Sequence, residues 1–539
     1  MSDGTMTADL IVVGGGLGGV AAALTAHRLG QTVILTTESR WLGGQMTSQG
    51  VPPDEHPWIE MPMTSPSYRD LRERIRDHYR RNYPLHPTAR DNPELNPGDG
   101  FVSGLCHEPR VAAVVFEELV SAAVADGRLS ILRGFRPVRA DRTGPAVTSV
   151  TVRGGDEDRE VQLRGTIIVD ATELGDLLEL ARVPFVIGAE ARSETGEMHA
   201  PAEADPLDQQ AVTWCFAVEY RHGEDHTIVK PPRYEYWRDR RDERWPAPQF
   251  SWTDVNPITL EPRALPIFLR DPTGMDPEPG HDFWHYRRVL ARANMTDDFP
   301  GGDVTSVNWP QVDYWELPLL GVDPATADRA RAEAREMSLA FLYWMQTEAP
   351  RADGGVGYPE LRLRGDVMGS DDGLALEPYI REARRIRARF TVTEGHIGRQ
   401  MRGDGAGAEL FSDSVGIGFY RIDLHPSTSG RTYVDIDCFP FQIPLGSLIP
   451  LGVDNLLPAA KNIGTTHITN GAYRLHPVEW SIGEAVGALS AFCQRNDRTP
   501  SQVYDDPSAI ERFQDLLTGE LGLTLAWPEE IRRTGRRLD

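Results

Sequence analysis

The chain opens with an apolar run, a glycine-rich turn and an alanine-rich helical pattern. Residues 8–13 (ADLIVV) end in a continuous apolar stretch, which is typical of a strand buried on both faces. Residues 20–30 (VAAALTAHRLG) predict a helix, and residues 31–37 (QTVILTT) predict a second strand. This order predicts a strand–helix–strand unit with parallel strands at the start of the chain.

Further along the chain, the patterns predict longer helices and several short strands. Helices are expected over residues 68–83, 109–126, 323–347, 378–390 and 481–493. The helix over 323–347 is the longest, with Asp323 or Pro324 at its start. Strands are expected over residues 129–132, 147–152 and 161–163, which form a meander, and over the buried segment 166–170.

The composition changes near Gly196 and divides the chain. Residues 200–398 contain most of the tryptophans and many prolines, with few clean periodicities. A chain of 539 residues is longer than one domain usually holds. We expect a dinucleotide-binding domain whose first part is residues 1–200, with an inserted loop and helix region at 54–105. A substrate domain over 201–400, a return segment over 401–500 and a helical tail over 501–539 complete the prediction.

Charge and cysteine content narrow the functional classes. The net formal charge is −24, which argues against nucleic acid or an anionic membrane as a partner. The four cysteines are scattered without a C-x-x-C pair, so we expect no metal site and no redox disulfide, with Cys106 a small buried residue. The N-terminus lacks the features of a secretory signal, and no window is apolar enough to span a membrane. These observations predict a cytoplasmic protein.

The first loop has the spacing G-x-G-x-x-G on Gly14, Gly16 and Gly19. Gly14 allows the tight turn, Gly16 lets the backbone approach a pyrophosphate, and Gly19 lets the helix pack close to the strand. The helix N-terminus then offers N–H groups and a positive dipole end to the phosphates. The motif predicts a dinucleotide site that also includes Leu17 and Gly18. The alternative is a glycine-rich turn between two buried elements.

The residue that binds the ribose is open to two interpretations. Counted from Gly14, the usual position of the ribose acid is Thr37, whereas the carboxylate comes one residue later, at Glu38. Either the strand end is shifted by one residue, or Thr37 uses its hydroxyl and Glu38 points elsewhere. We favour Glu38, with Ser39 beside it.

Several segments resemble a family of FAD-dependent oxidoreductases related to the fumarate-reductase flavoprotein and the glutathione-reductase superfamily. They lie between Leu10 and about Phe492 and are VVGGGLGGVAAA, WLGGQMTSQGVPPDEHPWIE, LCHEPRVA, DATELGDLL, YIREARR, FQIPLGSLIP and NLLPAAKNIGTTHITNGAYRLHPVEWSIGEAVG. The resemblance implies noncovalent FAD and an α/β fold. That fold is a Rossmann-like FAD-binding domain of the glutathione-reductase type with a second, mixed α+β substrate domain.

The same resemblance places further residues beside FAD. In such enzymes a glycine-pair loop runs along the cofactor, an ATG-type segment touches it, and a late strand passes beneath the flavin. Here Gly483 is expected near the start of a helix whose N-terminus points at the ring, where its dipole stabilises negative charge. The further cofactor-binding residues implied are Gly43, Gly44, Gln45, Ala171, Thr172, Lys461, Asn462, Gly483 and Glu484.

Four imidazoles are candidates for proton transfer or for anchoring a substrate. His476, just before the last predicted helix, is the first candidate, and His467 in the same segment is the second. His107 and His56 lie in loops of the resembling segments. For each of them, a structural hydrogen-bonding role is the alternative.

Three side chains are candidates for binding the substrate. Gln49 follows the glycine-pair loop and can hydrogen-bond the ring or the substrate. Arg381 and Arg385 belong to an arginine-rich segment, in which one guanidinium group would anchor a substrate carboxylate. The alternative is that these arginines are solvated or paired.

The resemblance implies redox chemistry on a small molecule. The first hypothesis is a dehydrogenase or oxidase that transfers hydride from a C–H bond of a small polar metabolite to flavin N5, with a histidine such as His476 as base. No second strand–GxGxxG–helix unit is visible, so the expected electron acceptor is O2, a quinone or an electron carrier. The alternatives are an NAD(P)H-dependent flavin monooxygenase, a fumarate-reductase-like ene-reductase and a non-catalytic flavin-binding protein. The sequence leaves the substrate and the oligomeric state open.

Overall fold

The computed structural model describes residues 4–269 and 282–534. Its centre is a seven-stranded sheet in the order β3-β2-β1-β6-β5-β4, in which β21 also pairs with β6. The parallel strands are β1 (Gly4–Val13), β2 (Val33–Thr37), β3 (Leu129–Arg133), β6 (Arg159–Asp170) and β21 (Leu456–Pro458). This parallel part confirms the predicted strand–helix–strand unit and gives the chain a Rossmann-like core.

β6 joins two parts of the sheet because it is long enough to pair with different neighbours along its length. Its first half lies antiparallel to β5 (Ala146–Gly154), with Leu163 opposite Val150, and its second half lies parallel to β21, with Ile168 opposite Leu456. The strands predicted over 161–163 and 166–170 are therefore one strand. The antiparallel meander consists of β4 (Phe135–Thr143), β5 and β6, and four charged residues in β4 obscure its strand pattern in the sequence. The strand predicted over 129–132 is not part of this meander, because it is β3 and pairs in parallel with β2.

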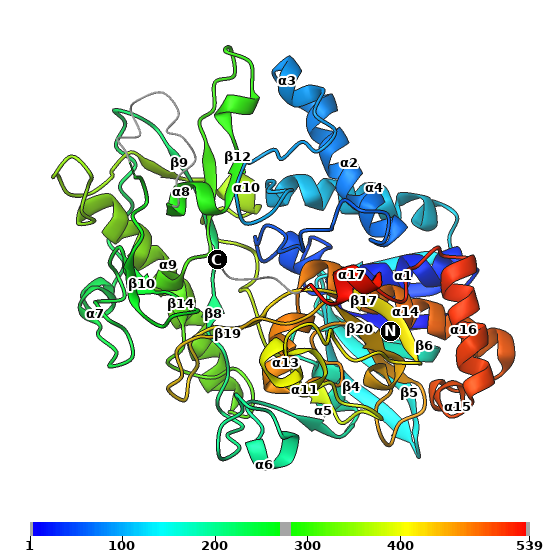
Figure 1. Cartoon of the computed structure of the whole chain (residues 1–539). Coiled ribbons are helices and arrows are strands. Elements are labelled where there is room, and N and C mark those ends of the chain that lie inside the picture. Colours follow the sequence, from blue (N-terminus) through cyan, green and yellow to red (C-terminus); the bar gives the residue numbers. More distant parts are fainter. Residues whose placement is uncertain (1–3, 270–281, 535–539) are drawn as a thin grey trace.

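Helices α1 (Leu17–Arg28) and α14 (His476–Asn496) pack so closely that backbone meets backbone. A Cβ atom on Gly18 would lie 1.7 Å from the carbonyl oxygen of Ala459, and a Cβ atom on Gly483 would lie 2.2 Å from the carbonyl oxygen of Gly18. No side chain fits in either place. Through this contact the C-terminal part of the chain lies against its first structural unit, as Figure 1 shows.

A second lobe, drawn in green in Figure 1, lies beside the main sheet. Its four-stranded antiparallel sheet has the order β12 (Arg288–Leu290), β13 (Val304–Val307), β9 (Phe216–Tyr220) and β15 (Leu361–Leu363). The long helix α9 (Pro324–Thr347) belongs to this lobe and confirms the helix predicted over 323–347; the Asp323 side chain accepts a hydrogen bond from the Thr326 N–H at its start. The lobe has its own aromatic core, which includes Trp309.

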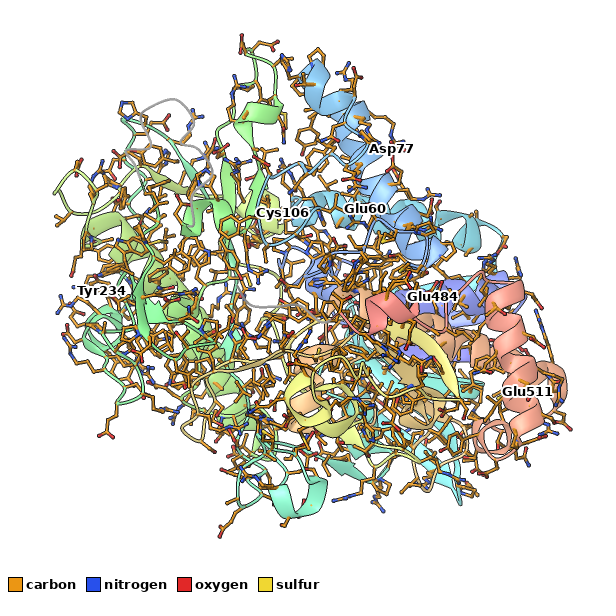
Figure 2. The ribbon with its side chains drawn as sticks, viewed as in Figure 1. Glu60, Asp77, Cys106, Tyr234, Glu484 and Glu511 are labelled. Carbon is orange, nitrogen blue, oxygen red and sulfur yellow. The ribbon has the colours of Figure 1, made fainter. Side chains whose placement is uncertain are left out.

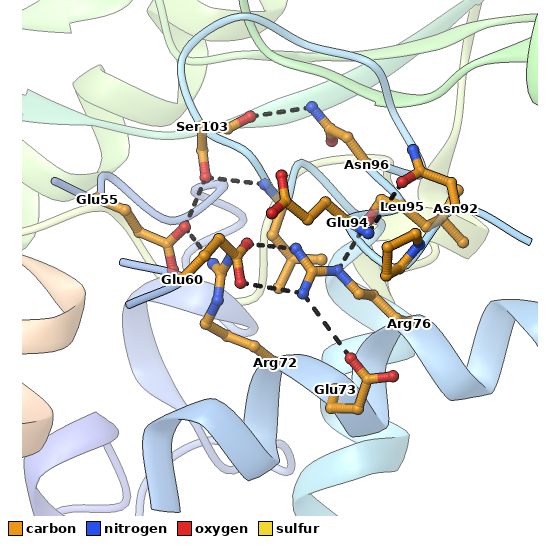
Figure 3. A network of polar contacts seen from close by, with 12 residues as sticks. Glu55, Glu60, Arg72, Glu73, Arg76, Asn92, Glu94, Leu95, Asn96 and Ser103 are labelled. Carbon is orange, nitrogen blue, oxygen red and sulfur yellow. Dashed lines mark hydrogen bonds and ion pairs between the residues drawn. The ribbon is translucent and has the colours of Figure 1, made fainter. Parts of the chain in front are cut away.

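Helices α2 (Pro66–Asn82) and α3 (Pro87–Arg90) lie in the region predicted as an insertion over 54–105, and α4 (Pro109–Ala125) follows it. α2 and α4 confirm the helices predicted over 68–83 and 109–126. Buried ion pairs connect α2 to the preceding loop (Figure 3). Arg72 contacts both Glu55 and Glu60, and Arg76 Nη2 donates to Glu60 Oε1 over 2.5 Å. Ser103 Oγ donates to Glu55 over 3.0 Å. This network fixes the loop that precedes α2.

The remaining elements are short. The strands are β7 (Phe185–Val186), β8 (Val212–Thr213), β10 (Thr253–Val255), β11 (Pro262–Ala264), β14 (Asp313–Tyr314), β16 (Arg385–Ile386), β17 (Ser414–Gly418), β18 (Ile422–Leu424), β19 (Val434–Ile436) and β20 (Phe441–Pro444). The helices are α5 (Asp176–Leu180), α6 (Arg192–Thr195), α7 (Tyr234–Asp239), α8 (Phe283–Tyr286), α10 (Gly365–Met368), α11 (Glu394–Ile397), α12 (Arg399–Arg402), α13 (His467–Tyr473), α15 (Pro500–Tyr504), α16 (Pro507–Gly519) and α17 (Glu529–Arg532). The 3-10 helices are η1 (Gly44–Met46), η2 (Arg292–Asn294), η3 (Pro310–Val312) and η4 (Leu445–Leu448).

Two helix predictions are corrected. The helix predicted over 378–390 is wrong, because this segment is extended and pairs through β16 with β7. Its arginines donate hydrogen bonds to buried acceptors on other segments. Such distant contacts cannot be detected from the local pattern of the sequence. The last predicted helix begins at His476, five residues before Ser481, so Gly483 lies inside α14 and not near its start.

None of the described helices is both long and apolar enough to cross a lipid bilayer. The predicted C-terminal tail over 501–539 contains α16 and α17, with residues 535–539 outside the described part of the chain. Cys106 is fully buried, and burial raises the pKa of its thiol to about 12. Figure 2 shows it between the inserted helices and the second lobe, in agreement with the prediction that it is a small buried residue.

The contact between α1 and α14 can be tested by a substitution that adds one methyl group. We expect Gly483→Ala to lower the free energy of unfolding by about 2–3 kcal/mol, since its Cβ would overlap a backbone carbonyl oxygen that has no free space to move into. The matched control is Gly519→Ala at the exposed end of α16, where a Cβ meets nothing within 4 Å. Chemical denaturation of both variants would measure this, and equal stabilities would contradict the packing described.

Candidate cofactor and substrate site

The glycine loop between β1 and α1 lies against β6 and leaves its middle glycine open. Gly14 has φ +114°, and a Cβ there would lie 2.0 Å from the carbonyl oxygen of Ala171. A Cβ on Gly19 would lie 2.0 Å from the carbonyl oxygen of Gly14. A Cβ on Gly16 would approach only two carboxylate oxygens, each at 3.2 Å. The fold therefore requires Gly14 and Gly19, whereas Gly16 lies in the wall of the adjoining cavity, where its Cβ would meet only side-chain atoms.

A buried carboxylate lies at the N-terminus of α1, beside Leu17. The Gly18 N–H donates to Glu479 Oε1 over 3.2 Å, and Gln45 Nε2 donates to Glu479 Oε2 over 2.5 Å. Burial raises the pKa of Glu479, against the opposing charge of Lys461. A helix N-terminus stabilises such an anion. Glu479 is not among the predicted site residues, and only its place in the resembling HPVEW segment points to it.

A cavity of about 460 Å³ opens beside this loop, within the size range of small-molecule and cofactor sites. Its walls come from the ends of β1, β2 and β6, from the loop after β2 and from residues 376–380 of the extended segment. The sequence-predicted residues in its lining are Gly14, Gly16, Glu38, Gly44, Gln49, Ala171 and Thr172. Trp41, Arg136, Glu173, Trp214, Arg331 and Glu377 line it without having been predicted.

The second glycine loop closes onto the first. Gly43 has φ +105°, and a Cβ there would lie 2.4 Å from the ring of Phe116. Gly44 has φ +50°, and its Cβ would lie 2.9 Å from the Cα of Gly16. Both positions are thus restricted to glycine by conformation and by space. Gly44 also lines the cavity, so the two loops together form one of its ends.

Thr37 and Glu38 both line the cavity, at the end of β2. The Thr37 hydroxyl donates to the carbonyl oxygen of Ser39 over 3.2 Å, so its hydrogen is used within the loop. Glu38 is exposed along the cavity wall, yet protein atoms crowd its carboxyl group. This desolvation and the nearby Asp176 raise the pKa of Glu38 to about 7. The geometry favours Glu38 over Thr37 as the acceptor that faces the cavity.

The late strand β21 leads to a buried cation and an amide. Lys461 forms an ion pair with Glu173. The negative charges of Glu173 and Glu479 raise the pKa of Lys461, although burial alone would lower it. Asn462 Nδ2 donates to the carbonyl oxygen of Asp170 over 3.0 Å, which ties the strand to the end of β6. Lys461 thus contacts the cavity wall through Glu173, whereas Asn462 has a structural bond.

His476 and His107 are both buried, and their hydrogen bonds give them opposite tautomers. His476 Nδ1 accepts the Asp54 N–H over 3.1 Å, which puts the proton of a neutral ring on Nε2. His107 Nδ1 lies 2.8 Å from the carbonyl oxygen of Leu105 and donates to it, which leaves Nε2 as an acceptor. His107 Nε2 has no partner within the described residues, whereas His476 also has the backbone of Val51 as a hydrogen-bond partner. Burial lowers the pKa of His476 to about 3 and that of His107 to about 4, so both rings are neutral at physiological pH.

The other two imidazoles are held by protein groups. His467 Nδ1 lies 2.8 Å from Glu382 Oε1, and its backbone N–H donates to Glu190 over 2.9 Å. His56 packs edge-on against Trp527 with ring centroids 5.3 Å apart, and burial lowers its pKa to about 3. The sequence placed all four histidines in one functional group, but the structure distributes them among different environments.

Gln49 is buried with both amide atoms unpartnered among the described residues, and it lines the cavity. The predicted arginines have protein partners instead. Arg381 Nη2 donates to Asp313 over 3.1 Å, and Arg385 Nη2 donates to Glu190 over 3.0 Å and to the carbonyl oxygen of Gly188 over 2.7 Å. Their role as substrate anchors stays a prediction, while their pairing matches the alternative.

The residues predicted at the start of the last helix lie elsewhere. Gly483 forms the contact between α14 and α1, and Glu484 accepts hydrogen bonds from Ser65 and Ser67 over 2.7 and 2.5 Å. Figure 2 shows Glu484 near the base of the inserted helices. Burial raises the pKa of Glu484 to about 7. Because α14 starts at His476, its N-terminal turn presents Glu479 to the glycine loop instead.

The family model described as "FAD dependent oxidoreductase" matches residues 9–517 of this chain. No relative with a curated function matches it.

Solved structures with a partly similar fold are distant. A geranylgeranyl bacteriochlorophyll reductase-like protein from Thermoplasma acidophilum has 10% identity and a TM-score of 0.34 over 96% of this chain and 85% of that chain. The anhydrotetracycline hydroxylase OxyS from Streptomyces rimosus has 12% identity and a TM-score of 0.33 over 96% of this chain and 68% of that chain. L-proline dehydrogenase from P. horikoshii has 18% identity and a TM-score of 0.18, and the match covers 35% of this chain and 24% of that chain.

The carboxyl groups around the cavity predict a pH-dependent stability. Desolvation and the nearby Glu173 raise the pKa of Glu377 to about 7, above its usual value. The stability associated with its proton is therefore present at low pH and is lost as the pH rises through about 7. We expect Glu377→Gln to be more stable than the wild type near pH 8 by about 1 kcal/mol, a figure reduced for partial exposure, and equally stable near pH 4, below the ordinary pKa of a glutamate.

Chemical denaturation of the cofactor-free protein at both pH values measures this difference. The matched control is Glu235→Gln on α7, whose carboxyl pKa is lowered by a hydrogen bond from Lys230. A gain in stability at pH 8 in the control, or no such gain in Glu377→Gln, would contradict the raised pKa assigned to Glu377.

Proposed function

The chain belongs to the FAD-dependent oxidoreductase family, and on that premise we propose that it is a dehydrogenase or oxidase of a small polar metabolite. When bound, FAD supplies a flavin N5 atom that takes up hydride from a C–H bond. The observation that carries the proposal is the cavity at the two glycine loops, which ends among polar side chains including the unpartnered Gln49 amide.

The residues around the cavity fit FAD. Gly16 exposes backbone where a pyrophosphate needs close approach, and the N-terminus of α1 favours its charge. Glu38 is placed for a ribose, and Arg136 and Arg331 supply positive charge in the lining. All parallel pairs between named strands of the described chain belong to the one main sheet, which supports the absence of a second dinucleotide domain.

The hydrogen bonds of the buried imidazoles suggest separate tasks for them. A proton acceptor needs a free lone pair, which His107 offers at Nε2. His476 carries its proton on Nε2 instead, and a substrate oxygen would take the place of the Val51 backbone as its acceptor. We therefore propose His107 in place of His476 as the base and His476 as a donor. A matched pair of His107→Gln and His476→Gln tests this: only the first should remove a basic group from the pH profile of kcat/KM.

The position of the pyrophosphate can be tested at Gly16. Gly16→Ala should fold with a modest loss of stability, since its φ is −68° and its Cβ meets only the carboxylate oxygens of Glu173 and Glu479, each at 3.2 Å. We expect the FAD Kd to rise by about ten-fold or more, which corresponds to at least about 1.4 kcal/mol. Gly104→Ala, where a Cβ meets nothing within 4 Å, is the control. FAD fluorescence titration with thermal melts measures both properties, and unchanged FAD binding in Gly16→Ala would overturn the placement.

The reaction class can be tested with the FAD-loaded protein under anaerobic conditions. We expect a polar metabolite from a panel to bleach the visible flavin absorbance without NAD(P)H, because the fold offers one dinucleotide site. Admission of oxygen then separates an oxidase, which recovers its colour quickly, from a dehydrogenase, which does not. Bleaching only by NAD(P)H with an oxygenated product, or re-oxidation only by an unsaturated acid, would replace the proposal by a monooxygenase or an ene-reductase.

A further inference from the structure

A buried polar cluster adjoins the cavity on the side of the second lobe. It contains Arg287 at the start of β12, Arg474 at the end of α13, Asp54 in the loop before α2, and Tyr379 and Tyr420. Arg287 is 7% exposed and Arg474 is 2% exposed. Two guanidinium groups at this depth need good partners, because an unpaired buried charge is costly.

Arg287 lacks such partners. Its closest described contact is between Nη2 and Asp54 Oδ1 at 3.4 Å, and the buried Nε and Nη1 have no hydrogen-bond partner in the described ranges. The next residue, Arg288, is buried to a similar degree and is well paired: it donates to the carbonyl oxygen of Gly98 over 2.8 Å and to Asp303 over 2.9 Å. The fold can therefore satisfy an arginine at this place, yet it leaves Arg287 with free donors.

Arg474 also lacks a hydrogen-bond partner, but for only one of its nitrogen atoms. Its Nη1 donates to the Tyr379 hydroxyl, and its Nη2 donates to the Asp423 carbonyl oxygen over 3.1 Å, with the Asp423 carboxylate at 3.4 Å. Its Nε is buried and unpartnered among the residues described. Both arginines thus keep N–H groups for an acceptor that the chain does not supply.

The cluster and the cavity share two segments of the chain. Tyr379 lies between Pro378 and Ile380, which both line the cavity wall. Gln49 is five residues from Asp54 on the same loop and lines the cavity with an unpartnered amide. Asp54 in turn donates its backbone N–H to His476. Segments 49–54 and 378–380 therefore connect the free donors with the end of the cavity that the proposed function assigns to the substrate.

We propose that Arg287 and Arg474, with the Gln49 amide, bind a carboxylate of the substrate, so that the enzyme acts on a small carboxylic acid. A carboxylate supplies the acceptor oxygens that the two guanidinium groups lack, and arginine binds this planar group with matched geometry. Asp54 and Asp423 balance the two arginines, which favours a singly charged group over a phosphate dianion. This inference rests on the proposed function and names its substrate class.

The test uses the FAD-loaded protein and simple anions. Benzoate and succinate are titrated while the flavin absorbance is followed, with benzamide as the neutral counterpart and inorganic phosphate as the dianion. We expect both carboxylates to perturb the spectrum with saturation, and benzamide and phosphate to bind at least about ten-fold more weakly. Equal binding of benzamide, or tighter binding of phosphate, overturns the carboxylate assignment.

Two neighbouring variants separate binding from folding. Arg287→Met should weaken carboxylate binding by about ten-fold or more and lower Tm less than Arg288→Met does, because its ion pair with Asp54 is the longer one, at 3.4 Å. Arg288→Met should lower Tm and keep the carboxylate affinity, since its charge is structurally paired. Loss of Tm in Arg287→Met with unchanged carboxylate affinity would show that Arg287 is structural and would overturn the inference.

Failure of the inference and failure of the proposed function give different results. If a neutral metabolite bleaches the flavin and carboxylates do not bind, the proposed function stands and the carboxylate site is wrong. If carboxylates bind in an Arg287-dependent way and no metabolite reduces the flavin, the site stands and the redox proposal is wrong. Tryptophan fluorescence of the cofactor-free protein gives a readout of carboxylate binding that does not depend on the flavin.

Discussion

The close approach of backbone at the first glycine loop is the constraint on which the rest of the structure depends. At Gly14, Gly18 and Gly19 a single methyl group would overlap a carbonyl oxygen of β6, of the segment after β21 or of the loop itself. Segments from the beginning, middle and end of the chain therefore meet at one point. Because they are packed without side chains between them, the end of β1, the N-terminus of α1 and the start of α14 have fixed relative positions. The cavity is the space that this arrangement leaves beside Gly16.

Buried charges hold the surroundings of the cavity in place. Arg72 with Glu55 and Glu60 fixes the loop before α2, and Arg381 with Asp313 connects the extended segment to the second lobe. Such pairs add little net stability, but breaking one leaves an uncompensated buried charge. They therefore fix the position of the loop that carries Gln49 and Asp54. Arg287 differs from these arginines, because its described ion pair is the 3.4 Å contact with Asp54 and its guanidinium group otherwise lies over the Tyr286 ring.

The electrostatics of the cavity are unusual for the pyrophosphate site that we propose there. Glutamates 38, 173 and 377 line it, and Glu479 occupies the helix N-terminus behind it. Desolvation raises the pKa of Glu38 and of Glu377 to about 7, so part of this negative charge is absent near neutral pH. Lys461 neutralises another part through Glu173. The anion-binding capacity of the site therefore comes from backbone N–H groups and the dipole of α1 more than from a surplus of basic side chains.

The sequence by itself determined the features that depend on near neighbours in the chain. The glycine spacing, the apolar strand before it and the helices over 68–83, 109–126 and 323–347 are local patterns, and the structure confirms them because each element is decided by its own periodicity and end residues. The resemblance of longer segments to FAD-dependent oxidoreductases predicted that the cofactor is FAD. Only the tertiary structure decided where the remaining chemistry lies. The arginines of segment 378–390 suggested a helix, but acceptors far away in the chain hold that segment extended. The position of Gly483 is set by its contact with α1, and that of Glu479 by its hydrogen bond to the glycine loop. The tautomers of His107 and His476 depend on which ring nitrogen is hydrogen-bonded to a backbone group. None of these partners is near in sequence to the residue it directs, except Leu105 to His107, and a contact between distant segments leaves no local pattern to detect.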